Sequence, residues 1–205
     1  MFLILYCNHC KGFHFDFSNL SDKLLVNSTT NLRSCIMANL FQSEQLIVTH
    51  ALETDIQWIM TLERKDENKN FVFQGSYKDH LKEINDPATL LCIIKEKKDH
   101  QTIGYFLGEH DSKNNIFEFR RFVIDLKGQG FGTELTKALM AYTFNALEIN
   151  RFWLDVFTYN MTGIHVYEKL GLNRDGIIRE GYKDGDTYKS YYIYSILKRE
   201  YEDLY

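Results

Sequence analysis

The stretch K-G-Q-G-F-G-T, residues 127–133, decides the fold because of what stands on each side of it. A strand-like run, Phe119 to Ile124, precedes it, and an amphipathic helix that continues to about Leu147 follows it. Glycines at alternate positions let the main chain approach a ligand without an intervening Cβ. The start of a helix adds unpaired N–H groups and the positive end of the helix dipole. This order of strand, glycine loop and helix predicts a cradle for a phosphate group.

The loop does not match two well-known phosphate-binding loops. The dinucleotide fingerprint G-x-G-x-x-G needs a glycine where Thr133 stands, and an acidic residue at the end of the next strand, where Val156 and Phe157 stand. A Walker loop needs G-K-[ST], whereas this chain has Gly132-Thr133-Glu134. A glycine-rich turn without a ligand would also fit the loop taken alone. The downstream sequence therefore has to decide.

A second motif follows at residues 151–172, R-F-W-L-D-V-F-T-Y-N-M-T-G-I-H-V-Y-E-K-L-G-L. It predicts a strand to Phe157, a helix that Asn160 caps, and a helix end at Gly171. Asn160 and Tyr167 are seven residues apart, which is close to two helical turns, so both side chains should lie on nearly the same face of the helix.

These two motifs and the tail R-E-G-Y-K-D-G-D-T-Y-K-S-Y-Y-I-Y-S-I-L, residues 179–197, closely resemble the Gcn5-related N-acetyltransferases. Within that family the chain is most similar to the branch of ribosomal-protein N-terminal and spermidine acetyltransferases. The resemblance is dense from about Ile103 to Tyr201, weaker from Gln45 to Ile94, and absent before Asn39. It implies an α/β (α+β) fold, with a mixed, mostly antiparallel sheet of about six to seven strands flanked by helices.

The resemblance also implies acetyl-coenzyme A as the cofactor, with its pyrophosphate on the glycine loop. The family pattern [RQ]-x-x-G-x-[GA] falls on Lys127, Gly130 and Gly132. Lys127 departs from the usual Arg or Gln, which keeps the positive charge but loses the planar fork of arginine. The implied cofactor-binding residues are Phe122, Val123, Ile124, Lys127, Gly128, Gln129, Gly130, Phe131, Gly132, Thr133 and Asn160.

Catalytic roles follow from the resemblance as well. Asn160 would contact the pantetheine arm, and Tyr167 would lie near the sulfur as general acid, since a phenol with a pKa of about 10 keeps its proton at neutral pH. Tyr167 could instead be a packing residue of its helix. Glu118 is the first candidate for the general base and Glu109 the second, either of them acting through water. Both could also be solvated charges at strand ends.

The acceptor is less well defined. The resembled branch includes enzymes for polyamines, protein N-termini and antibiotic amines. Glu63, Asp66 and Glu67 make the expected acceptor region locally acidic, which would suit a cationic amine, but solvated helix-end charge explains them equally well. Two other classes of function stay open, a catalytically silent acyl-coenzyme A binder and a protein-interaction module that uses the aromatic tail from Tyr182 to Tyr194.

Length and composition agree with this interpretation. The chain has 205 residues, a net charge of -4 and a pI near 6.0, which argue for one ordinary domain and against a nucleic-acid binder. No run of 18 apolar residues exists, so no membrane span is predicted. The N-terminus M-F-L-I-L-Y-C-N-H-C lacks a positive region and a cleavage site, which favours a cytoplasmic protein. A homodimer is a reasonable starting expectation for its assembly.

Residues 1–38 are predicted to be an extension, disordered or packed on the surface, beside a single domain at residues 39–205. Cys7, His9, Cys10 and His14 lie within eight residues. Structural zinc normally takes two ligand pairs from separated segments, so we predict no metal site. The cysteines do not suggest a disulfide framework.

The remaining elements follow from hydrophobic periodicity and turn signals. In the long helix, an apolar stripe of Leu135, Ala138, Leu139, Tyr142 and Ala146 is predicted to face the core. A hairpin turn is predicted at residues 183–186, K-D-G-D. The expected strands are Gln45 to His50, Leu90 to Lys95, Ile103 to Glu109, Ile116 to Ile124, Arg151 to Phe157, Asn173 to Tyr182 and Thr187 to Leu197, and the further helices are Thr54 to Arg64 and Ser76 to Ile84.

Overall fold

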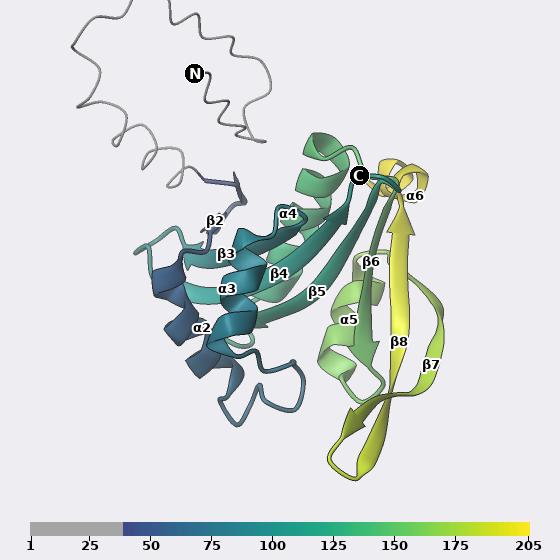
Figure 1. Ribbon diagram of the computed structural model, residues 1–205. Coiled ribbons are helices and arrows are strands. Elements are labelled where there is room, and N and C mark those ends of the chain that lie inside the picture. Colours follow the sequence, from purple (N-terminus) through teal and green to yellow (C-terminus); the bar gives the residue numbers. More distant parts are fainter. Residues whose placement is uncertain (1–38) are drawn as a thin grey trace, which may run out of the picture. The chain divides into compact units, whose positions relative to one another are not determined.

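The computed structural model describes residues 39–205, so the predicted extension and its cysteine and histidine group lie outside the described residues. The elements follow one another along the chain as strands with a few intervening helices (Figure 1). They are β1 (Phe41–Gln42), β2 (Leu46–His50), η1 (Glu53–Asp55), α2 (Ile56–Glu63), α3 (Tyr77–Asn85), β3 (Thr89–Glu96), β4 (Thr102–Asp111), β5 (Ile116–Ile124), α4 (Phe131–Ala146), β6 (Arg151–Phe157), α5 (Met161–Lys169), β7 (Asn173–Asp184), β8 (Thr187–Leu197) and α6 (Lys198–Leu204).

In the described part of the chain the strands form one sheet in the order β1-β2-β3-β4-β5-β6-β8-β7. β5 and β6 are parallel, and every other neighbouring pair is antiparallel. The predicted mixed, mostly antiparallel sheet is confirmed, with eight strands instead of six to seven. The additional strand β1 has two residues, which is too short for an alternating pattern to reveal. The terminal helix α6 was also not predicted.

Helices cover both faces of the sheet (Figure 1). One apolar cluster joins α4 and α5 to one face, and a second, smaller cluster joins α2 to the other. In α4 the predicted stripe is partly wrong. Leu135 and Leu139 are buried, but Met140 and Phe144 complete the buried face, whereas Ala146 is exposed. The longer side chains bury more apolar surface than alanine does, so they set how the helix is rotated on the sheet.

β5 and β6 separate after a short stretch of pairing. Only Ile116 to Glu118 pair with Arg151 to Trp153. Beyond that point β6 continues to pair with β8 as far as Phe157, while β5 keeps its partner β4 as far as Ile124. One edge of β5 therefore has main-chain N–H and C=O groups without a strand partner, and such groups need other partners.

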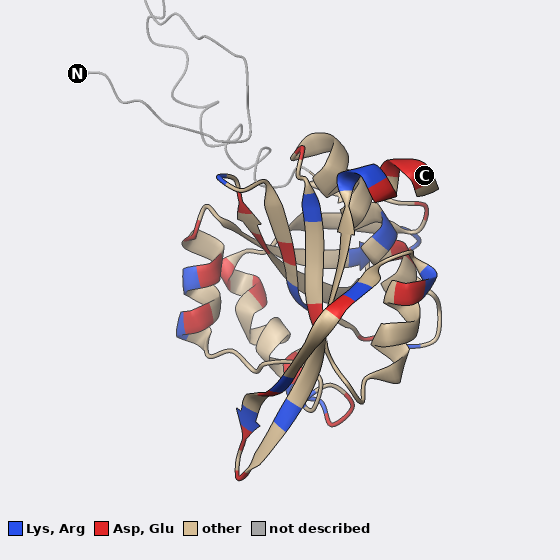
Figure 2. Ribbon diagram, turned by 90° about the vertical axis from the view of Figure 1, so that its right-hand side faces the viewer, with Lys and Arg blue, Asp and Glu red and all other residues tan. Residues whose placement is uncertain are grey.

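Positive and negative residues are interspersed over the helices and strands, without a region of one sign that covers several elements (Figure 2). Within residues 39–205 no helix combines the length and the apolar character that a bilayer span requires.

Candidate active site

A cleft of about 770 Å³ lies where β5 and β6 separate. Its walls are β5, the glycine loop, the first turns of α5, residues 67–74 of the α2–α3 connection, and the β7–β8 hairpin. The structure brings most of the predicted site residues to this cleft. They are Phe122, Val123, Ile124, Lys127, Gly128, Gly130, Phe131, Gly132, Thr133, Asn160 and Tyr167. Gln129, Glu118 and Glu109 are not among the residues that line it.

The glycine loop has the geometry of an anion cradle. Gly128 and Gly130 have φ angles of +76° and +83°, a conformation that disfavours residues with a Cβ. A Cβ at either position would meet no atom within 4 Å, so both glycines border open space. Within residues 39–205, no protein oxygen accepts from the main-chain N–H groups of Gly130, Phe131, Gly132 or Thr133. These features fit a bound diphosphate.

Lys127 adds a positive charge, and its side chain is fixed by a residue that is distant in the sequence. Its Nζ donates to Oδ1 of Asn68 at 2.8 Å, and the amide of Asn68 donates to the carbonyl of Leu62. Lys65 forms an ion pair of 2.5 Å with Asp125. Burial lowers the pKa of Lys127. The connection between α2 and α3 is thus attached to the start of the glycine loop.

The main chain of β5 supplies the floor of the cleft. Phe122, Val123 and Ile124 pair with β4 on one side only, and all three line the cleft. Because the other edge has no strand partner, its N–H and C=O groups can bind an extended ligand that carries amide groups.

α5 places Asn160 and Tyr167 on the same cleft, as their spacing predicted. Asn160 is the N-cap, and its Oδ1 accepts from the N–H of Gly163 at 3.0 Å. Tyr167 is 6% exposed, so the phenol is packed by protein while it still borders the cleft. Burial, and then the negative charge of Asp155, raise the pKa of Tyr167 well above its ordinary value.

Asp155 is a cleft residue that the sequence reasoning missed. Leu154 and Val156 are buried in the core, so the alternation of the strand turns Asp155 to the opposite face. There its side chain is exposed to the cleft. Partial desolvation raises the pKa of Asp155, and Arg120 opposes this shift. The available signal was a single acid inside the otherwise apolar run W-L-D-V-F.

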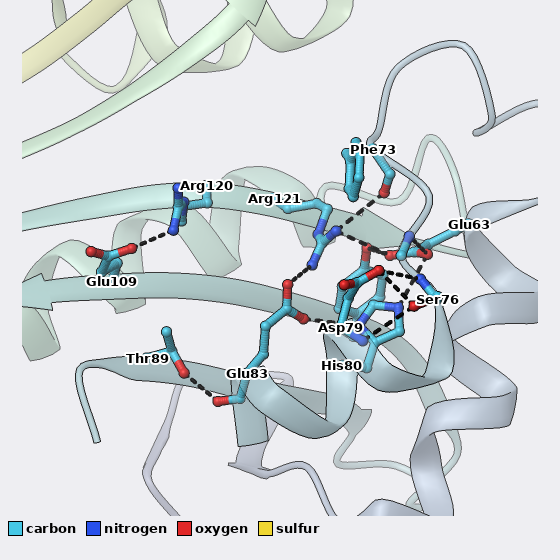
Figure 3. Close-up of polar contacts among 12 residues, drawn as sticks. Glu63, Phe73, Ser76, Asp79, His80, Glu83, Thr89, Glu109, Arg120 and Arg121 are labelled. Atoms are coloured by element: carbon cyan, nitrogen blue, oxygen red, sulfur yellow. Dashed lines mark hydrogen bonds and ion pairs between the residues drawn. The ribbon is translucent and has the colours of Figure 1, made fainter. Parts of the chain in front are cut away.

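Glu118 and Glu109, the predicted candidates for the general base, gather around Arg120 instead. Arg120 pairs with Glu109 (Figure 3), and its Nε lies 3.5 Å from Oε1 of Glu118. Desolvation raises the pKa of Glu118, although the charge of Arg120 lowers it. Glu118 is also opposite Trp153, where β5 and β6 are still paired.

A buried polar network underlies the cleft wall (Figure 3). Arg121 donates to Oε1 of Glu83 at 2.6 Å, and the hydroxyl of Tyr105 donates to Glu63 at 2.5 Å. His80 lies between Glu63 at 3.3 Å and Glu83 at 2.9 Å. Burial alone would lower the pKa of His80, but the two carboxylates raise it to about 9. The network holds α2 and α3 against the middle of β5.

This network changes the interpretation of the predicted acidic region. Glu63 is fully buried inside it, so it cannot face an acceptor. Asp66 forms an ion pair of 2.7 Å with Lys69. Of the three predicted acids, Glu67 alone lines the cleft.

The aromatic tail forms part of the cleft wall. Tyr182, Tyr191 and the ion pair between Lys189 and Asp184 line the cleft, with 2.5 Å between the charged atoms. The hairpin turn at residues 183–186 is confirmed, with Gly185 at a φ of +59°.

Residues 37–173 match the family described as acetyltransferase (GNAT) domain. The uncharacterized N-acetyltransferase YoaA of Bacillus subtilis is 33% identical over 178 residues, which cover 79% of this chain and 98% of that protein. The spermidine N(1)-acetyltransferase of Vibrio cholerae is 23% identical over 164 residues, which cover 76% and 95% of the two chains. This chain spans 53%, 66% and 61% of the length of three further relatives that are named N-acetyltransferases.

Solved structures share the fold. A spermidine N-acetyltransferase from Vibrio cholerae, in complex with CoA and spermine, superimposes with a TM-score of 0.69 at 21% identity. The match covers 77% of this chain and 98% of that one. At this level of identity the likeness establishes the fold alone.

Proposed function

We propose that this chain, which belongs to the acetyltransferase (GNAT) family, moves the acetyl group of acetyl-coenzyme A to a primary amine by direct transfer in a ternary complex. The acceptor is a small amine such as a polyamine, or a protein N-terminus. One observation carries the proposal. The glycine loop, the free edge of β5 and the phenol of Tyr167 border a single cleft.

The residues present fit two parts of coenzyme A, its diphosphate and its pantetheine arm. The glycines at positive φ and the unpaired N–H groups from Gly130 to Thr133 would hold the diphosphate. The free edge of β5 from Phe122 to Ile124 would hold the pantetheine arm through its amide groups. When bound, acetyl-coenzyme A supplies an electrophilic thioester carbonyl and a thiolate leaving group.

Tyr167 is the proposed general acid. Its pKa lies above the ordinary value of 10.0 because the ring is buried, so Oη keeps its proton over the physiological range and can give it to a thiolate. A main-chain N–H on the strand from Phe122 to Ile124 would stabilise negative charge on the carbonyl oxygen. Asn160 would orient the arm beside Tyr167 through its amide nitrogen, since its oxygen caps α5.

The reaction also needs a general base that accepts a proton from the acceptor amine. Glu118, the first candidate from the sequence, is near the base of the opening and is ion-paired with Arg120. A carboxylate in that position can act through a chain of water molecules.

A substrate screen tests the proposal. Purified protein, acetyl-coenzyme A and a panel of spermidine, short peptides and aminoglycosides are incubated together, and thiol release is measured. We expect release with at least one amine. Tyr167→Phe should lower kcat about 10²-fold or more, whereas Tyr142→Phe, a half-buried phenol on α4 outside the cleft, should keep wild-type activity.

Two outcomes would contradict it. Unchanged activity of Tyr167→Phe would remove the acid role. Binding of coenzyme A, seen as a rise in melting temperature, together with no thiol release for any amine would favour the silent binder over the enzyme.

A further inference from the structure

Asp155 occupies the middle of β6, on the side of the cleft opposite β5. Its neighbours Leu154 and Val156 are buried in the core below the sheet. The position therefore projects the carboxylate into the opening between the two strands, beyond the point where their pairing ends at Glu118 and Trp153.

The other charges of this part of the cleft have partners. Lys189 pairs with Asp184, and Arg121 pairs with Glu83. Among the described residues, no lysine or arginine is within ion-pair distance of Asp155, and no side chain donates a hydrogen bond to it. Arg120 lines the same cleft and acts on Asp155 from a distance, but it is paired with Glu109 and lies beside Glu118. A carboxylate that faces a cleft without a cation in contact favours a positively charged occupant.

A second unpaired carboxylate of the wall, Glu67, lies at the other end of the cleft. Its charge acts on Lys127 of the glycine loop, at the end where the diphosphate would bind. Asp155, in contrast, acts on Tyr167. Asp155 and Tyr167 are therefore within electrostatic range of each other. Asp155 on β6 can accept a proton and Tyr167 on α5 can donate one, and both border the same cleft.

We propose that Asp155 binds the ammonium group of the acceptor and takes its first proton, so that it is the general base and selects cationic primary amines. This inference rests on the proposed function, because it assigns a residue to the same reaction. It replaces Glu118, which does not line the cleft, with a carboxylate that does.

The proton transfer is aided by the surroundings of both groups. Desolvation disfavours charge, so it raises the pKa of a carboxylate and lowers that of an ammonium group. The cleft already raises the pKa of Asp155. An amine that enters the cleft and displaces water from this position brings the two pKa values closer together, which makes the transfer less costly.

The reaction balances with these two residues. The ammonium gives one proton to Asp155, and the nitrogen lone pair forms the new C–N bond. The C–S bond breaks with its electron pair on sulfur, which takes the proton of Tyr167. After the C–N bond has formed, the nitrogen loses a second proton, which passes through solvent to the phenolate of Tyr167 and restores the phenol. Asp155 releases its proton to solvent when the product leaves. Each turnover transfers one acetyl group and releases one proton.

Three charged or titratable groups interact electrostatically with Asp155 from the elements around it. They are Glu118 and Arg120 on β5 and Tyr167 on α5. Glu109 on β4 shares Arg120 with Glu118, and the pair Asp184 and Lys189 on the hairpin lines the same cleft. Arg120 is paired with Glu109 and lies beside Glu118, and it forms no ion pair with Asp155. Substitutions at Asp155 and at Glu118 therefore change different contacts, and comparing the two variants separates their effects on activity.

The test compares Asp155→Asn, Asp155→Glu and Glu118→Gln, with Asp203→Asn on the exposed face of α6 as the matched control. The acceptors are spermidine and a short peptide with a free N-terminus. The measurements are kcat/KM from pH 6 to pH 10, the Kd for coenzyme A, and the melting temperature. Asp155 is exposed to the cleft, so the variant should fold.

We expect Asp155→Asn to lower kcat/KM about 100-fold at pH 7 without changing the Kd for coenzyme A. Its kcat/KM should then rise about tenfold per pH unit up to the pKa of the amine, since the variant needs an acceptor that is already neutral. The wild type should be flat over the same range. Asp155→Glu should recover part of the activity, and Asp203→Asn should match the wild type.

Three outcomes would overturn the inference. An even loss at every pH would assign Asp155 a structural role. A wild-type profile for Asp155→Asn, with the loss appearing in Glu118→Gln, would return the base to β5. Failure of the wild type to bind coenzyme A or acetylate either amine would remove the proposed function and this inference with it, and that failure is distinguishable because it appears before any substitution is made.

Discussion

Raising the pH is expected to destabilise this domain through one residue, His80. The pKa of His80 rises from an ordinary value of 6.5 to about 9 in the folded protein, because the carboxylates of Glu63 and Glu83 outweigh the effect of burial. At about 1.4 kcal/mol per pKa unit, this difference corresponds to about 3 kcal/mol of the free energy of unfolding. Because the folded pKa is the higher one, that contribution is fully present below pH 6.5 and is lost as the pH rises through 9.

Urea unfolding of the wild type and of His80→Gln at pH 6, 7.5, 9 and 10 measures this contribution. Other groups titrate in the same range, so the informative quantity is the difference between the two proteins at each pH. We expect the wild type to lose about 3 kcal/mol more than the variant between pH 6 and pH 10. The melting temperature should follow the same order.

Parallel pH dependences of the two proteins would refute this reasoning. An independent measurement covers the case in which His80→Gln does not fold. The ring of His80 in the wild type can be titrated by NMR, and a midpoint near 6.5 instead of about 9 would show that the two carboxylates do not stabilise its charged form.

Two substitutions have matched controls in the chain. Gly130→Ala and Gly185→Ala each place a Cβ at positive φ in open space, so each should lower the free energy of unfolding by about 1–2 kcal/mol. Only Gly130→Ala should also weaken the binding of coenzyme A, with a Kd about tenfold higher or more when measured by calorimetry. Equal affinities would contradict the cradle. Arg121→Met leaves Glu83 without its buried arginine and should lower the free energy of unfolding by about 3–5 kcal/mol, whereas Arg120→Met, at an exposed pair, should cost less than about 1 kcal/mol. Similar denaturant midpoints for the two arginine variants would disprove the energetic role of the buried network.

The family was recognisable from local sequence. The resemblance carried by residues 127–133 and 151–172 is confirmed by the family match and by the relatives, and the family carries with it acetyl-coenzyme A as acetyl donor. The fold class is confirmed by the sheet and by the solved structures. Glycine φ angles, the Asn160 cap and the hairpin turn depend on residues within one or two turns of the chain. Residues that are close in the sequence are therefore enough to predict these local features.

The composition of the candidate active-site cleft depended on contacts between distant segments. Asn68 meets Lys127 across 59 residues of sequence, and Glu63 meets Tyr105 across 42. No local pattern could tell that Glu63 is buried or that Glu118 pairs with Arg120 and does not line the cleft. Asp155 lines the cleft only because β5 and β6 separate after three paired residues. Local preferences set the backbone of each motif, whereas the packing of the sheet sets which charges lose their water and which face a ligand, and this decides their chemistry.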